Sequence, residues 1–263
     1  MTVPDYNPAR ENPHHLPRKT FTQYSAELDR EMPVARWGDF GVPVLLFPTA
    51  GGDYLECERF LMIRALSPLI AARRICVFAC ASISGDGWMN GEAHPGHRAW
   101  LQELFDRYLA RTLLPAIRAE CGGYPTVIGA GSSLGAYNAV NAACRHPDSF
   151  SKVIAMSGTF DFDKWQTKWP SYTPGRDQTY YFHQPLRFLP GLRGTLLDRL
   201  RNVEFLVATG QGRWEEPAQS ERLARTLRTL GVPVKLDLWG HDCDHDWPTW
   251  RTMLPMFLDH LVD

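Results

Sequence analysis

The stretch that decides the fold is an apolar run followed by a glycine- and serine-rich turn, residues 126–140, TVIGAGSSLGAYNAV. Residues Gly131 to Gly135 match Gly-x-Ser-x-Gly, with Ser133 at the central position. The β-branched residues before the turn predict a buried strand, and the small residues from Ala136 to Cys144 predict a helix. A serine at a tight turn from a strand into a helix is typical of an exposed nucleophile, whereas an ordinary Gly/Ser turn is the alternative interpretation. We therefore predict Ser133 as a catalytic nucleophile.

The residues around this serine also predict how negative charge on a bound carbonyl oxygen would be stabilised. A helix that starts after Ser133 directs its first N–H groups and its positive dipole end toward the serine. We expect the oxyanion donors to be the backbone N–H of Leu134 and that of Ala50 or Gly51. Ala50 and Gly51 follow an apolar run, Val42 to Phe47, that predicts a core strand. An ordinary strand-to-helix turn is the alternative for that loop.

Bulk composition favours one globular domain and gives no sign of a nucleic-acid or membrane partner. The chain has 263 residues, is 44% hydrophobic and has a formal net charge of −1. Its six cysteines form no Cys-x-x-Cys motif and do not suggest a disulfide framework. The first 19 residues are polar and proline-rich, without the apolar core of a signal peptide. We expect a soluble cytoplasmic protein, and the sequence leaves its oligomeric state open.

Strand-like and helix-like runs alternate along most of the chain. This order predicts the α/β class, with a mostly parallel central sheet and helices on both faces. Residues 161–200 interrupt the alternation with many aromatic, proline and glycine residues. We predict an extended N-terminal arm, residues 1–19, and a single domain, residues 20–263, that carries a cap inserted at about residues 161–200. The predicted strands are 20–28 and 33–37 (both at sheet edges), 42–47, 75–83, 126–128, 152–157, 203–209 and 234–239, and the helices are 60–74, 97–120 with a bend near Pro115, 136–144, 217–230 and 248–261.

A nucleophilic serine needs a general base, and two histidines follow the last predicted strand. His245 directly precedes the closing helix and is followed by aromatic residues that could enclose an imidazole, so we favour it over His241. His146, His183 and His260 lie at a helix end, in the cap and in the last helix. The segment from His241 to Asp246 also contains enough histidines and aspartates for a metal site, but its glycine and proline neighbours favour a loop. We expect no metal.

The acid that orients the base should follow the predicted strand 203–209. The loop there contains no aspartate and reads GQGRWEEP over residues 210–217, with two adjacent glutamates before Pro217. Both glutamates could instead complement the dipole of the next helix. We predict Glu215 as the orienting acid and keep Glu216 as the close alternative.

Taken in order, four segments resemble the putative esterase family of α/β-hydrolases, which includes esterase D, feruloyl esterases and mycolyltransferases. They are GAGSSLGAY (129–137), RHPDSF (145–150), VIAMSG (153–158) and HDWPTW (245–250). The resemblance runs from about Val42 to the C-terminus. It implies an α/β-hydrolase fold and Ser-acid-His acyl transfer without a cofactor. The mycolyltransferases use a glutamate after a Gly-Asn-Gly-type loop, which Gly210-Gln211-Gly212 resembles, whereas the commoner family pattern has an aspartate a few residues after the first glycine.

These observations predict a serine hydrolase that cleaves carboxylic esters of small molecules through an acyl-enzyme. Acyl transfer to another acceptor by the same residues and a non-catalytic binding protein on the same fold are the alternatives. Aromatic side chains suit an apolar or aromatic acyl group. The predicted substrate-binding residues are Tyr54, Trp88 (which the family resemblance implies), Trp165, Trp169 and Tyr181.

Overall fold

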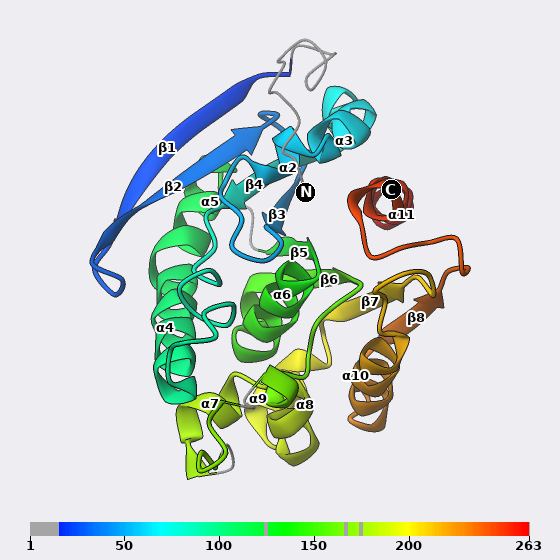
Figure 1. Cartoon of the computed structure of the whole chain (residues 1–263). Coiled ribbons are helices and arrows are strands. Elements are labelled where there is room, and N and C mark those ends of the chain that lie inside the picture. Colours follow the sequence, from blue (N-terminus) through cyan, green and yellow to red (C-terminus); the bar gives the residue numbers. More distant parts are fainter. Residues whose placement is uncertain (1–15, 124–125, 166–167, 174–175, 263) are drawn as a thin grey trace.

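An eight-stranded sheet forms the centre of the molecule (Figure 1). The computed structural model describes residues 16–123, 126–165, 168–173 and 176–262, so most of the predicted N-terminal arm lies outside the described residues. The strand order is β1-β2-β4-β3-β5-β6-β7-β8; β1, β2 and β4 pair antiparallel and all other neighbours are parallel. The α/β-hydrolase fold and the mostly parallel sheet are therefore confirmed. The strands are β1 (Arg18–Ser25), β2 (Arg30–Trp37), β3 (Val42–Phe47), β4 (Ile75–Cys80), β5 (Val127–Ser132), β6 (Phe150–Met156), β7 (Glu204–Thr209) and β8 (Val234–Leu238).

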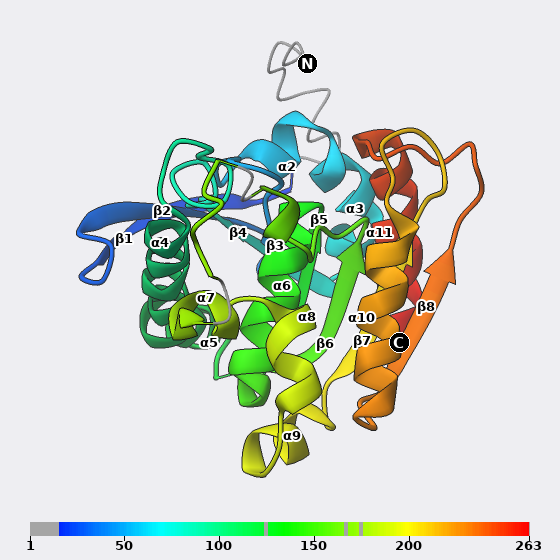
Figure 2. The same ribbon diagram turned by 60° about the horizontal axis from the view of Figure 1, so that its bottom comes forward.

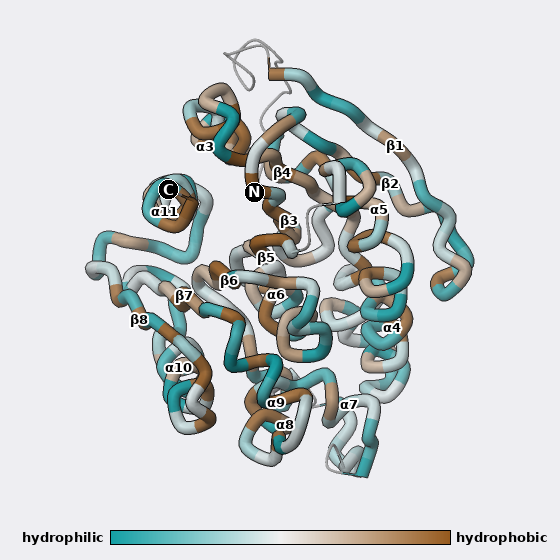
Figure 3. The backbone as a smooth tube through the Cα atoms, turned by 180° about the vertical axis from the view of Figure 1, so that it is seen from behind, coloured by the Kyte–Doolittle hydropathy of each residue, from teal (hydrophilic) through white to brown (hydrophobic). Residues whose placement is uncertain are grey.

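Helices cover both faces of this sheet (Figures 1 and 3), because successive residues of the central strands β3, β4 and β5 are buried and therefore both faces need cover. The helices α3 (Met62–Ala71) and α11 (Trp247–Leu261) lie on one face and pack on each other. The other face carries α4 (Pro95–Tyr108), α5 (Leu114–Glu120), α6 (Leu134–Arg145) and α10 (Pro217–Thr229). Each layer has its own apolar core, which contains side chains such as Leu66 and Met253 in the first and Phe105 and Tyr137 in the second.

The register of the parallel strands sets which loops meet at the carboxyl edge of the sheet. Ser132 at the end of β5 pairs with Met156, and Met156 pairs with Ala208 in β7. Residues that directly follow these three, Ser133, Ser157 and Thr209, therefore leave the sheet side by side. On the other flank of β5, Phe47 at the end of β3 pairs with Gly131. The loops after β3, β5, β6 and β7 thus share one edge, where ligands of open α/β sheets bind.

Several element boundaries differ from the sequence prediction. The predicted helix 97–120 is divided by a π-helical turn, Leu109–Leu113, between α4 and α5. The ring of Pro115 cannot accommodate the carbonyl of the fourth residue before it, so the helix widens there instead of only bending. A short helix, α2 (Glu56–Arg59), was not predicted, and β2 lies inside the sheet because it pairs with both β1 and β4.

The segment between β6 and β7 contains short helices that follow the outer side of α6 (Figure 2). α7 contacts α4, α8 contacts α6 and α10, and α9 contacts the turn after α6. Because α6 begins beside Ser133, this segment starts near the turn that contains Ser133 and extends along the helix layer, away from that turn. Its elements are a 3₁₀ turn (Asp163–Trp165), α7 (Gln178–Phe182), α8 (Pro185–Phe188), a second 3₁₀ turn (Leu189–Gly191) and α9 (Thr195–Leu200); a further 3₁₀ turn, Pro147–Ser149, follows α6.

Candidate active site

Ser133 occupies a strained turn between β5 and α6. Its backbone has φ 56° and ψ −121°, a combination that a residue with a side chain adopts at a cost of about 1–3 kcal/mol. The flanking glycines make this turn possible, because a Cβ on Gly131 would overlap the backbone of Gly135, and a Cβ on Gly135 would overlap the carbonyl oxygen of Phe47. The backbone N–H of Ser133 donates to the carbonyl of Met156 at 3.0 Å, which holds the turn against β6.

The loop after β3 lies against the first turn of α6. The carbonyl oxygen of Pro48 is only 2.7 Å from the position that a Cβ of Gly135 would take, so the loop and the helix N-terminus approach each other closely. Within this loop Ala50 has a positive φ of 37°, and its carbonyl accepts a hydrogen bond from the Ser82 hydroxyl at 3.2 Å. Leu134 is the first residue of α6, so its N–H has no acceptor within its own helix.

Glu56 fixes the shape of the same loop from behind. Its carboxylate is buried and accepts hydrogen bonds from the N–H of Thr49 at 2.7 Å and from the Thr49 hydroxyl at 2.8 Å. A Cβ on Gly52 would overlap this carboxylate, which explains a glycine there. Burial raises the pKa of Glu56 to about 7, although the two hydrogen bonds from Thr49 oppose the rise. The charge of the group that supports the loop is therefore sensitive to pH near neutrality.

Glu215 and His245 meet at the carboxyl edge, near the ends of β7 and β8. The Nδ1 atom of His245 lies 3.4 Å from Oε2 of Glu215. The Glu215 side chain is 1% exposed and that of His245 is 22% exposed, so the carboxylate is enclosed while the imidazole reaches solvent. Burial raises the pKa of Glu215, but hydrogen bonds from His245 and Ser157 outweigh it, so the pKa is lower than that of an ordinary glutamate. Glu215 is therefore a buried carboxylate held in its charged form.

Ser157 and Thr209, which the sequence analysis missed, donate to this carboxylate, and Trp250 is one of the aromatic residues that were expected to enclose the imidazole. Ser157 donates from its hydroxyl to Oε1 of Glu215 at 2.5 Å, and Thr209 donates to Oε2 at 3.1 Å. Trp250 donates from its indole N–H to the Ser157 hydroxyl at 2.9 Å, and its ring packs edge-on against His245. Ser157 directly follows β6 and Thr209 ends β7, both at the carboxyl edge of the sheet, and a polar residue at that position is the signal that could have identified them.

Two glycines allow the loops of Glu215 and His245 to interlock. A Cβ on Gly210 or Gly212 would overlap the backbone carbonyl region of Cys243. The N–H of Gly212 donates to the carbonyl of Cys243, and the N–H of His245 donates to the carbonyl of Arg213, both at 3.0 Å. The Gly-x-Gly sequence before Glu215 is thus required by close backbone packing.

The other members of the segment from His241 to Asp246 have structural partners. Asp244 forms an ion pair with Arg213, Asp246 accepts from the N–H of Trp247 at the start of α11, and His241 contacts the carbonyl of Gln211. Among the residues that the structure describes, no group of three or more histidine, cysteine, aspartate or glutamate side chains is arranged to hold a metal ion.

The structure brings some of the predicted site residues into contact and leaves others apart. His245 contacts Glu215, but within the described part of the chain no hydrogen bond joins His245 to the Ser133 hydroxyl. Glu216 is exposed at the start of α10 and accepts a hydrogen bond from Gln219. The predicted base therefore contacts the predicted acid, and no hydrogen bond joins it to the predicted nucleophile within the described residues.

The predicted substrate-binding aromatics lie in different surroundings. Trp88 is 1% exposed, stacks on Phe162 with ring centroids 4.6 Å apart and donates to Gln102, so it links the loop after β4 to the inserted segment. Tyr54 packs on the α3–α11 side, and Trp165 packs against the opposite core. Trp169 lines a cavity of about 530 Å³ with His94, Tyr172 and Asp177, whereas Tyr181 is partly buried beside Phe182.

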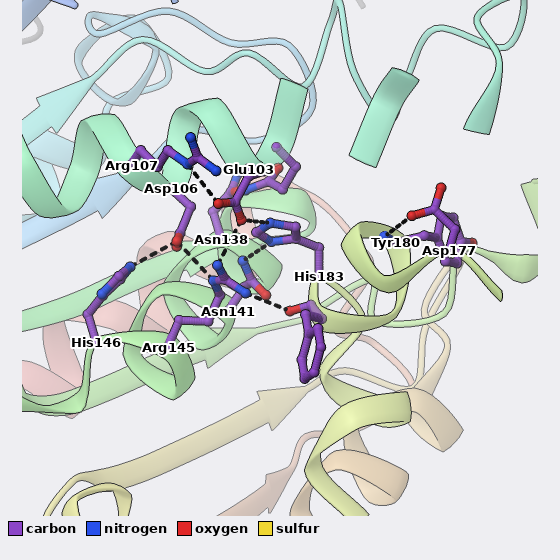
Figure 4. A network of polar contacts seen from close by, with 12 residues as sticks. Glu103, Asp106, Arg107, Asn138, Asn141, Arg145, His146, Asp177, Tyr180 and His183 are labelled. Atoms are coloured by element: carbon purple, nitrogen blue, oxygen red, sulfur yellow. Dashed lines mark hydrogen bonds and ion pairs between the residues drawn. The ribbon is translucent and has the colours of Figure 1, made fainter. Parts of the chain in front are cut away.

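His146 and His183 belong to a polar network that joins α4, α6 and the inserted segment (Figure 4). Nε2 of His183 is 2.9 Å from Glu103, and Nε2 of His146 is 2.9 Å from Asp106. Arg145 forms ion pairs with both carboxylates. The pKa of Glu103 is lowered to about 2, chiefly by the hydrogen bond from His183, and burial lowers the pKa of His183. His183 therefore holds the inserted segment on the helix layer, whereas His146 joins the end of α6 to α4.

Comparison with known proteins agrees with this architecture. The model of the family described as Putative esterase matches residues 84–261. This chain belongs to the putative esterase family. The match begins after β4 and contains the elbow of Ser133 and the loops of Glu215 and His245.

Several solved structures share the fold over nearly the whole chain. A ferulic acid esterase is similar with a TM-score of 0.70 and 17% identity over 94% of this chain and 97% of that one. The MPT51 (FbpC1) protein of Mycobacterium tuberculosis is similar with a TM-score of 0.69 and 18% identity, over 94% and 98% of the two chains. An S-formylglutathione hydrolase from Staphylococcus aureus is similar with a TM-score of 0.60 and 15% identity, over 95% of this chain and 97% of that one. At these identities the likeness shows the fold alone.

Two further searches, one among curated proteins and one among the described helices of this structure, found nothing. A search of curated proteins found no significant match. Among the described residues, no helix is both long enough and apolar enough to cross a membrane.

Proposed function

We propose that this chain is a serine esterase that cleaves small carboxylic esters through a covalent acyl-enzyme, with Ser133 as nucleophile, His245 as general base and Glu215 as orienting acid. The observation that carries the proposal is the buried Glu215 carboxylate beside His245 Nδ1, at the same edge of the sheet as the strained Ser133 turn. A buried carboxylate at Nδ1 keeps a proton on that nitrogen and leaves Nε2 as the base.

In the first half of the reaction, Ser133 Oγ attacks the ester carbonyl carbon while His245 Nε2 takes the hydroxyl proton. The negative charge that develops on the carbonyl oxygen faces the N–H groups of Leu134 and of Ala50 or Gly51. The closeness of the Ala50 loop to the first turn of α6 supports this pair of donors. Collapse of the intermediate breaks the bond to the alcohol, which leaves with the proton from His245.

In the second half, water attacks the acyl group on Ser133. His245 takes a proton from the water and returns it to the Ser133 oxygen as the carboxylic acid leaves. Glu215 stays charged throughout and stabilises the imidazolium, which the hydrogen bonds from Ser157 and Thr209 support. The chemistry proposed here uses side chains and backbone N–H groups of this chain.

The substrate class we propose is a small ester with an aromatic or apolar acyl group. The similarity to a ferulic acid esterase supports an aromatic acid, although the named substrate belongs to that protein. The partly exposed aromatic residues Tyr54, Trp165, Trp169 and Tyr181 are the candidates to contact the acyl group, whereas the predicted Trp88 is buried against Phe162. Acyl transfer to an alcohol by the same residues differs only in the acceptor that attacks the acyl-enzyme.

Two neighbouring serines give a matched test. Ser133→Ala should lower ester hydrolysis by about 10⁴-fold or more and should abolish labelling by a fluorophosphonate probe. Ser132→Ala is the control, because Ser132 ends β5 and is 4% exposed; it should still react with the probe. Circular dichroism should show both variants folded. If Ser133→Ala stays within about tenfold of wild type, Ser133 is not the nucleophile. A wild-type protein that fails to react with the probe would favour a binding protein.

A further inference from the structure

A cavity of about 540 Å³ lies at the amino edge of the parallel strands, away from the carboxyl edge that holds Ser133. It is bordered by the start of β3, the start of β4 and the residues that follow α5. Three arginines, Arg36, Arg73 and Arg74, and two cysteines, Cys76 and Cys121, are among its lining residues. The proposed esterase mechanism uses none of these groups.

The two cysteine sulfurs in this cavity are in contact. Sγ of Cys76 in β4 lies 3.8 Å from Sγ of Cys121, which directly follows α5. A disulfide has sulfurs about 2.05 Å apart, so a shift of less than about 2 Å would bring the pair to bonding distance. Cys76 is buried whereas Cys121 is partly exposed, so a reagent entering the cavity meets Cys121 first. The remaining cysteines are Cys57, Cys80 and Cys144, which are buried, and Cys243, which is partly exposed.

The surroundings make the two thiols chemically unequal. The hydrogen bond from Cys76 and, after it, the charge of Arg36 lower the pKa of the Cys121 thiol. The same contact and burial raise the pKa of Cys76. Arg36 is fixed in place because it donates to the carbonyl of Gly38 at 2.9 Å and to Glu120 at 3.2 Å. The charge of Arg36 favours the thiolate form of both cysteines, and Cys121 is the one of the two that is partly exposed.

The chain beside Cys121 has open space around it, and hydrogen bonds from the N–H groups of Cys121, Gly122 and Gly123 to carbonyls of α5 hold its backbone. Gly122 and Gly123 follow it with φ of 67° and 88°, and a Cβ on either glycine would meet no atom within 4 Å. Cys121 directly follows α5, so its displacement affects the hydrogen bonds that end the helix and none in its interior. By contrast, Cys76 is held in β4 between β2 and β3. Closure of the pair therefore requires movement of Cys121 alone.

We propose that Cys76 and Cys121 form an oxidisable dithiol site that takes small hydroperoxides through the cavity. The Cys121 thiolate attacks the terminal peroxide oxygen, the O–O bond breaks, and the alcohol or water leaves with a proton, which makes Cys121 a sulfenic acid. The Cys76 sulfur then attacks the Cys121 sulfur, and the hydroxyl leaves as water with the Cys76 proton. In sum, two thiols and one hydroperoxide give one disulfide, one alcohol (water, when the oxidant is hydrogen peroxide) and one water.

The test uses the full chain, reduced, freed of reductant and treated with a small excess of hydrogen peroxide. We expect wild type to lose two of its six thiols, to lose the mass of two hydrogens and to yield a non-reduced peptide pair that contains Cys76 and Cys121. Dithiothreitol should reverse all three changes. The cross-linked form should also unfold at a higher temperature, because the bond closes a long loop.

Three variants separate the steps. Cys121→Ser should form no disulfide, whereas Cys76→Ser should stop at a Cys121 sulfenic acid that dimedone traps, since the serine hydroxyl can still donate to Cys121. Cys243→Ser is the matched control, and its disulfide yield should equal that of wild type. The proposal is wrong if wild type keeps both thiols, or if Cys121 proceeds to sulfinic acid while Cys76 stays reduced. The wild-type peptide map tests the pairing even if a variant fails to fold.

Discussion

Replacing Glu215 by glutamine tests the polar cluster around His245, because the amide keeps the shape of the carboxylate and removes its charge. Both carboxylate oxygens are surrounded by donors. Oε1 accepts from the Ser157 hydroxyl and the Gly210 N–H, and Oε2 accepts from the Thr209 hydroxyl and lies beside His245 Nδ1. An amide nitrogen at the first position faces the Gly210 N–H, and at the second it faces the nitrogen of His245 that carries the proton, so either placement conflicts with a donor.

Each placement of the amide has a calculable consequence. An amide nitrogen facing Gly210 leaves a buried donor unpaired, which costs about 1–3 kcal/mol. An amide nitrogen facing His245 donates to Nδ1 and moves the imidazole proton to Nε2, so the base can no longer accept from Ser133. Both placements remove the negative charge that stabilises the imidazolium. We expect kcat/KM to fall by about 10³–10⁴, or about 4–5.5 kcal/mol of transition-state stabilisation.

The assay is hydrolysis of p-nitrophenyl esters of short acids, with thermal unfolding measured on the same samples. Glu216→Gln is the matched control, because Glu216 is the exposed neighbour, and it should stay within about threefold of wild type. Activity of Glu215→Gln within about tenfold of wild type would refute the reasoning. If Glu216→Gln is the inactive variant, the loop is correct and the choice of residue is wrong. If both variants lose little, Asp242 and Asp244 become the candidates.

Three further changes test the support of the site. Gly135→Ala should lower the free energy of unfolding by about 3 kcal/mol or more in urea titrations, because its Cβ would overlap a backbone carbonyl; unchanged stability would contradict the tight elbow. As pH rises from 4.5 to 7, the free energy of unfolding of wild type should fall by up to about 3 kcal/mol relative to that of Glu56→Gln, because in that window Glu56 ionises readily only in the unfolded chain. A difference between the two proteins that does not depend on pH would refute this. Wild type should lose stability as pH falls from about 4.5 toward 2, because unfolded Glu103 takes up a proton in that window while folded Glu103 stays charged, and Glu103→Gln should flatten this part of a plot of unfolding temperature against pH.

The local sequence was sufficient for the central strands and for the long helices that cover them. Alternating apolar runs predicted the central strands and their helices, since buried strands and amphipathic helices each have a characteristic pattern that needs no distant partner. Gly131 and Gly135 marked the turn at Ser133 in the same way, because their requirement for a missing side chain arises within five residues. The helix 97–120 shows the limit of this reasoning: Pro115 indicated a bend, but the wider π-helical turn before it was not predicted.

The surroundings of the candidate site depended on residues far apart in the sequence. Nothing in the Glu215-Glu216 pair itself says which side chain turns inward; Ser157 and Thr209, brought alongside by the register of β6 and β7, provide the donors around Glu215. The role of Gly210 likewise depends on Cys243, more than thirty residues away.

The sequence by itself therefore determined the order of strands and helices, the turn at Ser133 and the short set of polar residues near the strand ends, because each depends on neighbours along the chain. Only the tertiary structure decided that Glu215 faces His245, that His183 pairs with Glu103 and that Cys76 contacts Cys121. The physical reason is that a buried polar or thiol group takes its partner from whichever strand or helix packs beside it, and that neighbour is set by sheet order and register.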